Sequence, residues 1–318
     1  MKIKKHITLY IIIIFFIGNI SSQNQPLFEQ YHFNQLMLNP AYAGSKSTIE
    51  ANIFYRQQWL RMEGAPQSVS ATVHTKLFND KIGLGLKILQ EEIGATSKFD
   101  AGIQYAYRVY MTNAVLAIGI NANVTNYRLK YNNLDAFLDG DPAFTNQSVN
   151  TWSPNVGAGV WFNTEKIYAG LSAPLLLQDT TEINTEATVT QSNIFEARRH
   201  YYLSSGILLG DPEAFAIKPY TLIKYVPAAP WQIDINMSFI FKNSFWFGGS
   251  YRTNNSVSIL AEYFLQKEKM LKDNIFGFGY AYNFSLGDYQ KFFGPTHEIF
   301  FSYSFNKTTS KYTNPRFF

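Results

Sequence analysis

The sequence has 318 residues, of which 46% are hydrophobic and 17% aromatic, while only 16% are charged. An average globular domain is about a quarter charged, so this chain is poor in charge. A mean hydropathy of −0.14 excludes a bundle of apolar membrane helices, and the absence of cysteine excludes disulfides, thiol nucleophiles and thiolate metal sites.

The first 22 residues have the pattern of a secretory signal peptide. Three lysines precede a short apolar stretch over residues 9–17, and residues 21–23 are small or polar. A spanning helix needs about 20 apolar residues, so we expect cleavage near Ser22 instead of a membrane anchor. Cleavage lowers the formal net charge from +4 to +1, because 27 − 3 basic residues then face 23 acidic ones. No basic patch remains that would predict nucleic-acid binding.

Residues 23–47 follow the signal peptide and precede the first predicted strand. They include Phe28, Tyr31, Phe33 and Tyr42, which makes them too aromatic for a free tail. We therefore expect this segment to fold back against the rest of the chain.

Fourteen segments then alternate between apolar residues and small or polar ones, with the period of two that is typical of β-strands. No long amphipathic helix is predicted between them. The predicted strands cover residues 48–59, 67–77, 81–90, 97–110, 113–125, 153–162, 166–173, 200–209, 214–226, 231–241, 244–253, 256–266, 273–284 and 297–306.

The alternation is clearest in residues 273–284. One face carries aromatic rings, and the other carries Gly277, Gly279 and Ala281. Glycine weakens a strand because it leaves no side chain to pack. A wall of rings opposite a nearly bare face is expected where the outer solvent is lipid and the inner face lines a lumen.

The lengths of the connections separate a membrane barrel from a soluble β-sandwich, whose strands also alternate. Numbered in order, the odd connections include every long one, such as 126–152, 174–199 and 285–296, although 227–230 and 254–255 are short. The even connections are mostly tight turns. Outer-membrane barrels combine short periplasmic turns with long external loops.

We therefore predict an all-β, transmembrane outer-membrane barrel of about 14 antiparallel strands over residues 48–306. Residues 23–47 would fold into or against its periplasmic mouth as a plug, because a barrel of this size is wider than one filled by its own side chains. Residues 307–318 form a C-terminal tail.

The sequence contains no recognisable motif for catalysis, metal binding or nucleotide binding. No histidine pair has metal-ligand spacing, and no nucleotide-binding or nucleophile motif occurs. His200, beside Arg198 and Arg199, is the one candidate catalytic residue, and a solvated polar rim is the favoured interpretation. We expect no enzyme activity and no cofactor.

Two external connections carry further candidates. Asp135, Asp139 and Asp141 lie within residues 132–144, where calcium binding is an alternative to an ordinary polar loop, although the spacing does not match an EF-hand. The connection after the first strand contains Trp59 and Arg61, residue types that are enriched at protein interfaces. A tryptophan at the membrane surface is an equally good interpretation of Trp59.

A set of motifs runs in order from about residue 25 to the end of the chain. It includes FEQYHFNQLMLNPAYAGS (28–45), YRQQWLRMEGAPQS (55–68), IYAGLSAPLLL (167–177), IKPYTLIKYVPAAPWQIDIN (217–236), FWFGGSYR (245–252), GPTHEIFFSYSF (294–305) and PRFF (315–318). Each motif is weak alone, but their joint order closely resembles the PorP/SprF family of outer-membrane proteins from Bacteroidota. Gln35 and Arg61 depart from the usual pattern of the family.

The resemblance implies roles for the residues that match these motifs. Plug or lumen candidates are Asn39, Pro40, Ala41, Tyr42 and Gly44, partner-binding candidates are Arg56, Gln58, Trp59, Arg61, Gly64 and Pro66, and the family tail matches Pro315, Arg316, Phe317 and Phe318.

The resemblance also implies a function in the type IX secretion system. Such a barrel, integral in the outer-membrane lipid bilayer, supports the secretion and surface anchoring of a partner adhesin with a type IX C-terminal domain, and gliding motility in some bacteria. A periplasmic ring lipoprotein complex is a second expected partner. A plugged transporter or pore for small hydrophobic molecules stays open as the alternative, because the fold alone does not determine function.

Overall fold

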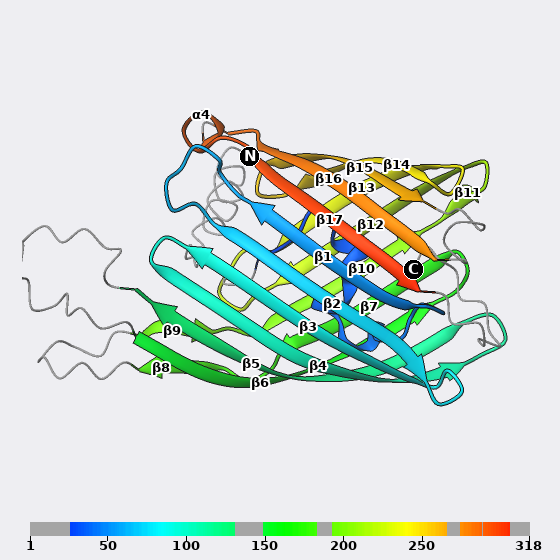
Figure 1. Cartoon of the computed structure of the whole chain (residues 1–318), viewed down its shortest axis with the longest axis horizontal. Coiled ribbons are helices and arrows are strands. Elements are labelled where there is room, and N and C mark those ends of the chain that lie inside the picture. The colour runs from blue at the N-terminus through cyan, green and yellow to red at the C-terminus, as the bar shows by residue number, and fades with distance from the viewer. Residues whose placement is uncertain (1–25, 131–148, 183–192, 266–273, 288, 306–318) are drawn as a thin grey trace, which may run out of the picture.

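The computed structural model describes residues 26–130, 149–182, 193–265, 274–287 and 289–305. Most of these residues are in β-strands (Figure 1). The strands are β1 Ile49–Gln57, β2 Gln67–Leu77, β3 Ile82–Ile93, β4 Thr96–Tyr110, β5 Val115–Leu129, β6 Val149–Asn163, β7 Ile167–Leu175, β8 Asp179–Glu182, β9 Asn193–Ala197, β10 His200–Ile207, β11 Leu209–Asp211, β12 Phe215–Tyr225, β13 Gln232–Phe241, β14 Phe245–Arg252, β15 Ser256–Leu265, β16 Ile275–Ser285 and β17 Thr296–Phe305. The described helices are short: η1 Tyr31–Phe33, α2 Gln35–Leu38, η2 Pro40–Tyr42 and α4 Tyr289–Phe293.

The main sheet is antiparallel and closes on itself. Strands that follow one another in the chain pair with each other, β10 pairs with both β7 and β12, and β1 pairs with β17. The sheet contains fifteen strand segments, but β10 and β11 both pair with β12 and continue one another on either side of Leu208. The described chain therefore forms the fourteen-stranded barrel that the alternation predicted.

The predicted strand boundaries differ most at β5 and β6. Both strands continue toward their long connection beyond the apolar pattern, and pairs such as Tyr127 with Thr151 extend the ladder. In these outer parts of β5 and β6, backbone hydrogen bonds hold the strands together, although the side chains no longer alternate in a way that predicts a strand. The β8–β9 hairpin and α4 lie within connections for which no elements were predicted. No helix in the described ranges is long and apolar enough to cross a membrane.

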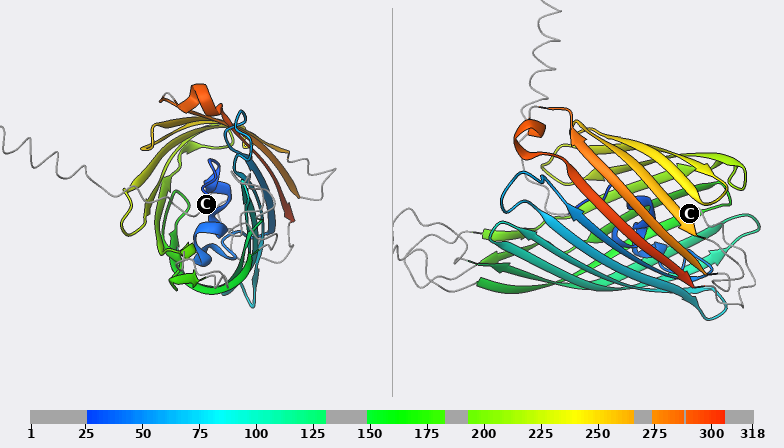
Figure 2. Two further views of the ribbon diagram at one scale, coloured as in Figure 1. Left: turned by 90° about the vertical axis from the view of Figure 1, so that its left-hand side faces the viewer. Right: turned by 45° about the horizontal axis from the view of Figure 1, so that its top comes forward.

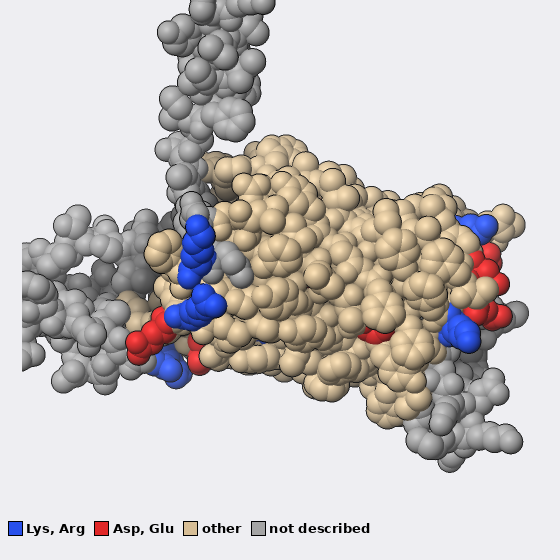
Figure 3. All heavy atoms as spheres, turned by 90° about the horizontal axis from the view of Figure 1, so that it is seen from above, with Lys and Arg blue, Asp and Glu red and all other residues tan. Residues whose placement is uncertain are grey.

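The two faces of the barrel wall have opposite chemistry. In β4, Ile103 is 61% exposed on the outside, whereas Gln104 is 3% exposed on the lumen side. In β16, Phe276 and Phe278 face outward and Gly277 faces inward, as predicted. On the face seen in Figure 3, described charged side chains gather at the two ends, and the wall between them is almost free of charge. This belt is suited to a bilayer.

The strand ends define the orientation of the barrel. Ile49 and Phe305 pair at one end, where the described turns, such as that between β2 and β3, are short. The opposite end carries the β8–β9 hairpin and α4. Because outer-membrane barrels have short periplasmic turns and longer external loops, we call these ends periplasmic and external, respectively.

Residues 26–47, here called the inner segment, lie inside the ring of strands (Figure 2). Nearly all of their side chains are buried. The segment begins beside the external parts of β14 and β17 and ends beside the periplasmic parts of β2 and β3. It thus follows the lumen instead of resting only at the periplasmic mouth.

Candidate functional site

The start of the inner segment is held by polar side chains from four strands. The Glu29 carboxylate accepts hydrogen bonds from Arg56 Nη1 at 2.8 Å, Arg252 Nη1 at 2.8 Å and the Ser258 hydroxyl at 2.7 Å. The Glu298 carboxylate accepts from the backbone N–H of Glu29 at 2.7 Å and from that of the next residue at 2.9 Å. These five residues are called the Glu29 clamp.

The Glu29 clamp is buried and nearly balanced in charge. Arg56 also lies 3.3 Å from Glu298, and Arg252 Nε donates to Asp234 at 2.9 Å. Burial raises the pKa of the Glu29 carboxyl, but Arg252 and Arg56 more than offset this effect and lower the pKa to about 2. Buried ion pairs add little net stability, whereas the loss of one partner is strongly destabilising. The clamp therefore specifies where the segment lies.

The end of the inner segment rests on a part of the wall that is rich in glycine. This glycine seat comprises Gly83 of β3, Gly119 of β5, Gly159 of β6 and Gly170 of β7. A Cβ atom on three of them would collide with the segment: with the Ala43 carbonyl oxygen at Gly83, the Ala41 nitrogen at Gly119 and Asn39 Oδ1 at Gly159. Glycine at these positions thus allows the backbone of the inner segment to contact the backbone of the strands directly.

Asn39 organises the turn that sits on the glycine seat. Its Oδ1 accepts from the Ala41 N–H at 3.0 Å, which caps η2, and its Nδ2 donates to the Val160 carbonyl of β6 at 2.9 Å. Gly44 has a φ of +68°, and its N–H donates to His74 Nδ1 at 3.3 Å. The five plug candidates, Asn39 to Tyr42 and Gly44, therefore lie together against the wall.

Aromatic rings pack against the opposite side of the inner segment. The ring centroid of Phe33 lies 5.4 Å from that of Trp246, 5.2 Å from that of Phe264 and 4.9 Å from that of Phe300. His32 is buried beside them, 4.0 Å from Glu262. Burial lowers the pKa of His32 well below its ordinary value, and nearby lysines lower it further.

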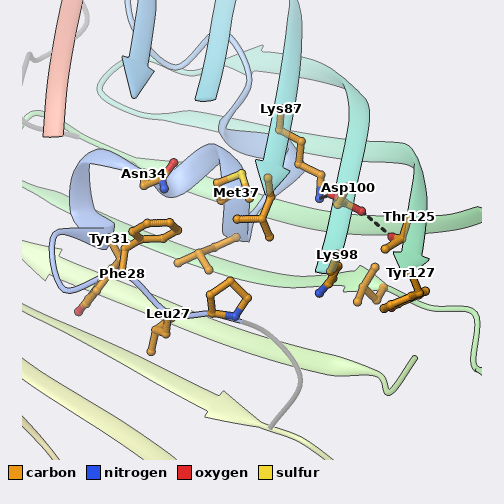
Figure 4. A pocket seen from close by; sticks show the side chains of 14 residues that line it. Leu27, Phe28, Tyr31, Asn34, Met37, Lys87, Lys98, Asp100, Thr125 and Tyr127 are labelled. Atoms are coloured by element: carbon orange, nitrogen blue, oxygen red, sulfur yellow. Dashed lines mark hydrogen bonds and ion pairs between the residues drawn. The ribbon is translucent and has the colours of Figure 1, made fainter. Parts of the chain in front are cut away.

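A small cavity remains between the inner segment and strands β3 to β5 (Figure 4). Its lining combines Met37 and Tyr31 with Lys87 and Asp100, which form an ion pair at 3.4 Å. Its volume is about 30 Å³, about the share of one water molecule in the liquid. Sites for organic ligands measure roughly 300–1,000 Å³, so this cavity is too small to hold one.

The first external connection packs on α4 and forms a surface called the rim ridge, residues 58–66 and 289–293. Arg61 N–H donates to the Phe293 carbonyl at 3.0 Å, and the Trp59 ring lies 5.4 Å from the Phe293 ring. Gly64 and Pro66 close this connection through backbone bonds from Gly94 N–H at 2.9 Å and Gln58 N–H at 2.9 Å, respectively.

The six partner-binding candidates divide between two places. Arg56 is buried in the Glu29 clamp, while Gln58, Trp59, Arg61, Gly64 and Pro66 belong to the rim ridge. Sequence reasoning missed Phe292, which is 73% exposed on this ridge, and it missed Glu29, Arg252 and Glu298 of the clamp. The alternation places Glu298 on the lumen face, but no signal in one sequence reveals which charges meet across a barrel.

The remaining sequence candidates are His200 and residues outside the described ranges. His200 is buried, with its Nδ1 2.8 Å from the Arg198 carbonyl oxygen. Among the residues that the structure describes, no three histidine or carboxylate side chains form a metal-binding group. The signal peptide, residues 132–144 and the tail residues Pro315 to Phe318 lie outside the described residues.

Comparison with solved structures finds outer-membrane channels. The deltaS2S3 mutant of the monoaromatic hydrocarbon channel TodX has a TM-score of 0.50 at 10% identity, covering 91% of this chain and 96% of that one. The monoaromatic hydrocarbon channel CymD has a TM-score of 0.50 at 11% identity, with 87% and 92% covered. The toluene transporter TodX of Pseudomonas putida has a TM-score of 0.44 at 10% identity, with 91% and 95% covered. At such identities the two likenesses with a TM-score of 0.50 show the fold alone.

The closed sheet and its apolar belt define an integral membrane β-barrel. A model of the family described as type IX secretion system membrane protein PorP/SprF matches residues 20–303. The match covers nearly the whole chain, so the protein belongs to this family. No curated protein matches the sequence.

Proposed function

We propose that this barrel retains a secreted partner protein at the cell surface as an outer-membrane component of the type IX secretion system. The family match over residues 20–303 carries the proposal. The filled lumen supports it, because a barrel whose interior is occupied by its own chain is better suited to holding a partner than to passing a substrate.

The partner we propose is an adhesin with a type IX C-terminal domain, with gliding motility as the process served in some cells. The rim ridge is the proposed contact. Leu60, Met62 and Phe292 are exposed there beside Trp59 and Arg61, and aromatic residues, methionine and arginine are enriched at protein interfaces. A periplasmic ring lipoprotein complex is the proposed second partner, at the opposite end.

The test is purification from native outer membrane in mild detergent, followed by mass spectrometry of co-purifying proteins. We expect one large secreted protein in near-stoichiometric amount with the wild-type barrel. Phe292→Asp should reduce that amount at least tenfold, because a charge would enter the apolar contact. Phe78→Asp is the matched control, since Phe78 is 74% exposed at the periplasmic end.

Two results would contradict the proposal. A barrel that purifies without a secreted protein lacks the proposed anchor function, and a small hydrophobic compound bound inside the lumen or steady ion conduction would favour the transporter alternative. Equal loss of the partner in both phenylalanine variants would show that the rim ridge is not the contact surface. It would not contradict the anchor function itself.

A further inference from the structure

The membrane-facing wall contains an open apolar groove in its periplasmic half. The groove has a volume of about 490 Å³ and runs over β15, β16, β17 and β1, which are neighbours in the sheet (Figure 1). Residues that line it include Ala51, Ile53, Phe276, Phe278, Phe301 and Tyr303. This volume lies within the roughly 300–1,000 Å³ of small-molecule sites.

Side-chain size along the strand register explains the groove. Phe276 pairs with Tyr303 and Phe278 with Phe301, with ring centroids 4.6 Å and 5.3 Å apart. Ala51 stands opposite Tyr303 on the other side of β17. The Ala51 methyl group is much smaller than these tilted ring pairs, so the rings stand above the surface of β1 and form one side of the groove.

Two tyrosines line the groove, Tyr263 beside Phe278 and Tyr303 at the periplasmic end. The Asn274 amide donates to the Tyr303 hydroxyl at 2.9 Å there, and tyrosines are typical of the level where hydrocarbon meets water. The exposed groove-lining side chains at Ile53, Phe278 and Phe301 are hydrocarbon. The groove therefore begins near the lipid headgroups and continues into the acyl region.

We infer that this groove binds one acyl chain of a phospholipid from the periplasmic leaflet. Water does not fill a groove at this depth, and an unfilled groove would lose dispersion contacts along its whole length. Each of the four strands is paired on both sides, so no backbone edge offers hydrogen bonds to a peptide. Within a bilayer, association depends on close packing, and the aromatic wall provides it.

The test measures phospholipid retained by the full-length protein after detergent extraction, using native mass spectrometry. We expect the wild-type barrel to retain one phospholipid and Ala51→Trp to lose it, because the indole would occupy the groove. Ala101→Trp is the matched control, since Ala101 also faces outward but belongs to β4 and does not line the groove. Ile53→Trp provides a second way to fill the groove.

Heat-modifiable migration on gels first confirms that each variant is a folded barrel. Loss of the phospholipid in Ala51→Trp or Ile53→Trp, with retention in Ala101→Trp, would establish the site. Equal retention in all four proteins, a wild-type barrel without bound phospholipid, or equal loss in every tryptophan variant would overturn the inference. So would the retention of a non-lipid molecule in the groove.

Discussion

At the scale of single residues, charge does most to position the inner segment. A loose aromatic segment in a fourteen-stranded barrel has many ways to pack, because hydrophobic contacts are not directional. The Glu29 carboxylate has one arrangement in which Arg56, Arg252 and Ser258 all donate to it. Any other packing of the inner segment would leave the buried Glu29 carboxylate without these donors, and an unpaired buried charge costs several kcal/mol of free energy.

Glu29→Gln is expected to loosen the inner segment while leaving the barrel folded. Arg56 and Arg252 would lose a shared carboxylate, and the removal of one partner of a buried pair costs about 3–5 kcal/mol. Hydrogen exchange of the amides at residues 29–45 should accelerate accordingly. Glu63→Gln is the control, because Glu63 is exposed in the first external connection. Unchanged exchange would show that the clamp does not hold the segment.

Acid is expected to release the inner segment. The docked Glu29 has a pKa of about 2, below its ordinary value of 4.5, so its contribution is complete above pH 4.5 and is lost as pH falls toward 2. His32 docks as a neutral ring with a pKa far below 6.5, so below pH 6.5 only the released segment gains a proton there. Both effects have the same sign, and intrinsic fluorescence or proteolysis from pH 7 to pH 3 should report progressive release. Greater protection in acid would contradict this.

At the scale of elements, glycines of the wall and the η2 turn form one contact. The sequence shows only that glycines occupy the lumen face of the strands. The structure explains them by the inner segment, whose backbone needs that space. The Ala41 and Ala43 backbones occupy the space that Cβ atoms at Gly119 and Gly83 would need. The inner segment and four strands therefore depend on each other for close packing.

Gly119→Ala is expected to displace the inner segment from its seat. The new methyl group would meet the backbone of Ala41, which cannot move aside as a flexible side chain would, and overpacking costs about 1–3 kcal/mol. Gly249→Ala is the matched control, because its Cβ would lie 3.6 Å from the nearest atom, an ordinary contact. Faster proteolysis between residues 39 and 45 in Gly119→Ala alone is the expected result, and equal behaviour of the two variants would exclude the seat.

Prediction from the sequence succeeded where a local period exists. Alternation identified all fourteen strands, and the pattern of residues 273–284 correctly assigned Phe276 to lipid and Gly277 to the lumen. It failed where the determinant is distant in sequence: Glu29 and Glu298 are 269 residues apart, and no period links them. The β8–β9 hairpin was also missed, because its short strands have no membrane belt to impose alternation.

At the scale of the whole molecule, we propose that the inner segment blocks passage through the barrel. Deletion of residues 24–44 is expected to raise ion conductance in planar bilayers strongly, because the Glu29 clamp and the seated turn would both leave the lumen. Barrels of 16–18 strands contain an aqueous channel, and one of eight is filled by its own wall. If the deletion protein folds and conducts like the full-length protein, the segment is not a plug.

The Glu29 clamp also lies across the seam where the two ends of the sheet meet. Arg56 belongs to β1 and Glu298 to β17, and pairing of these two strands turns an open sheet into a barrel. Glu29 contacts both from inside. During biogenesis, a chain that has placed Glu29 beside β1 already presents a bonding partner to the last strand to arrive. The segment that lies inside the finished barrel is thus also positioned to guide the closure of the wall around it.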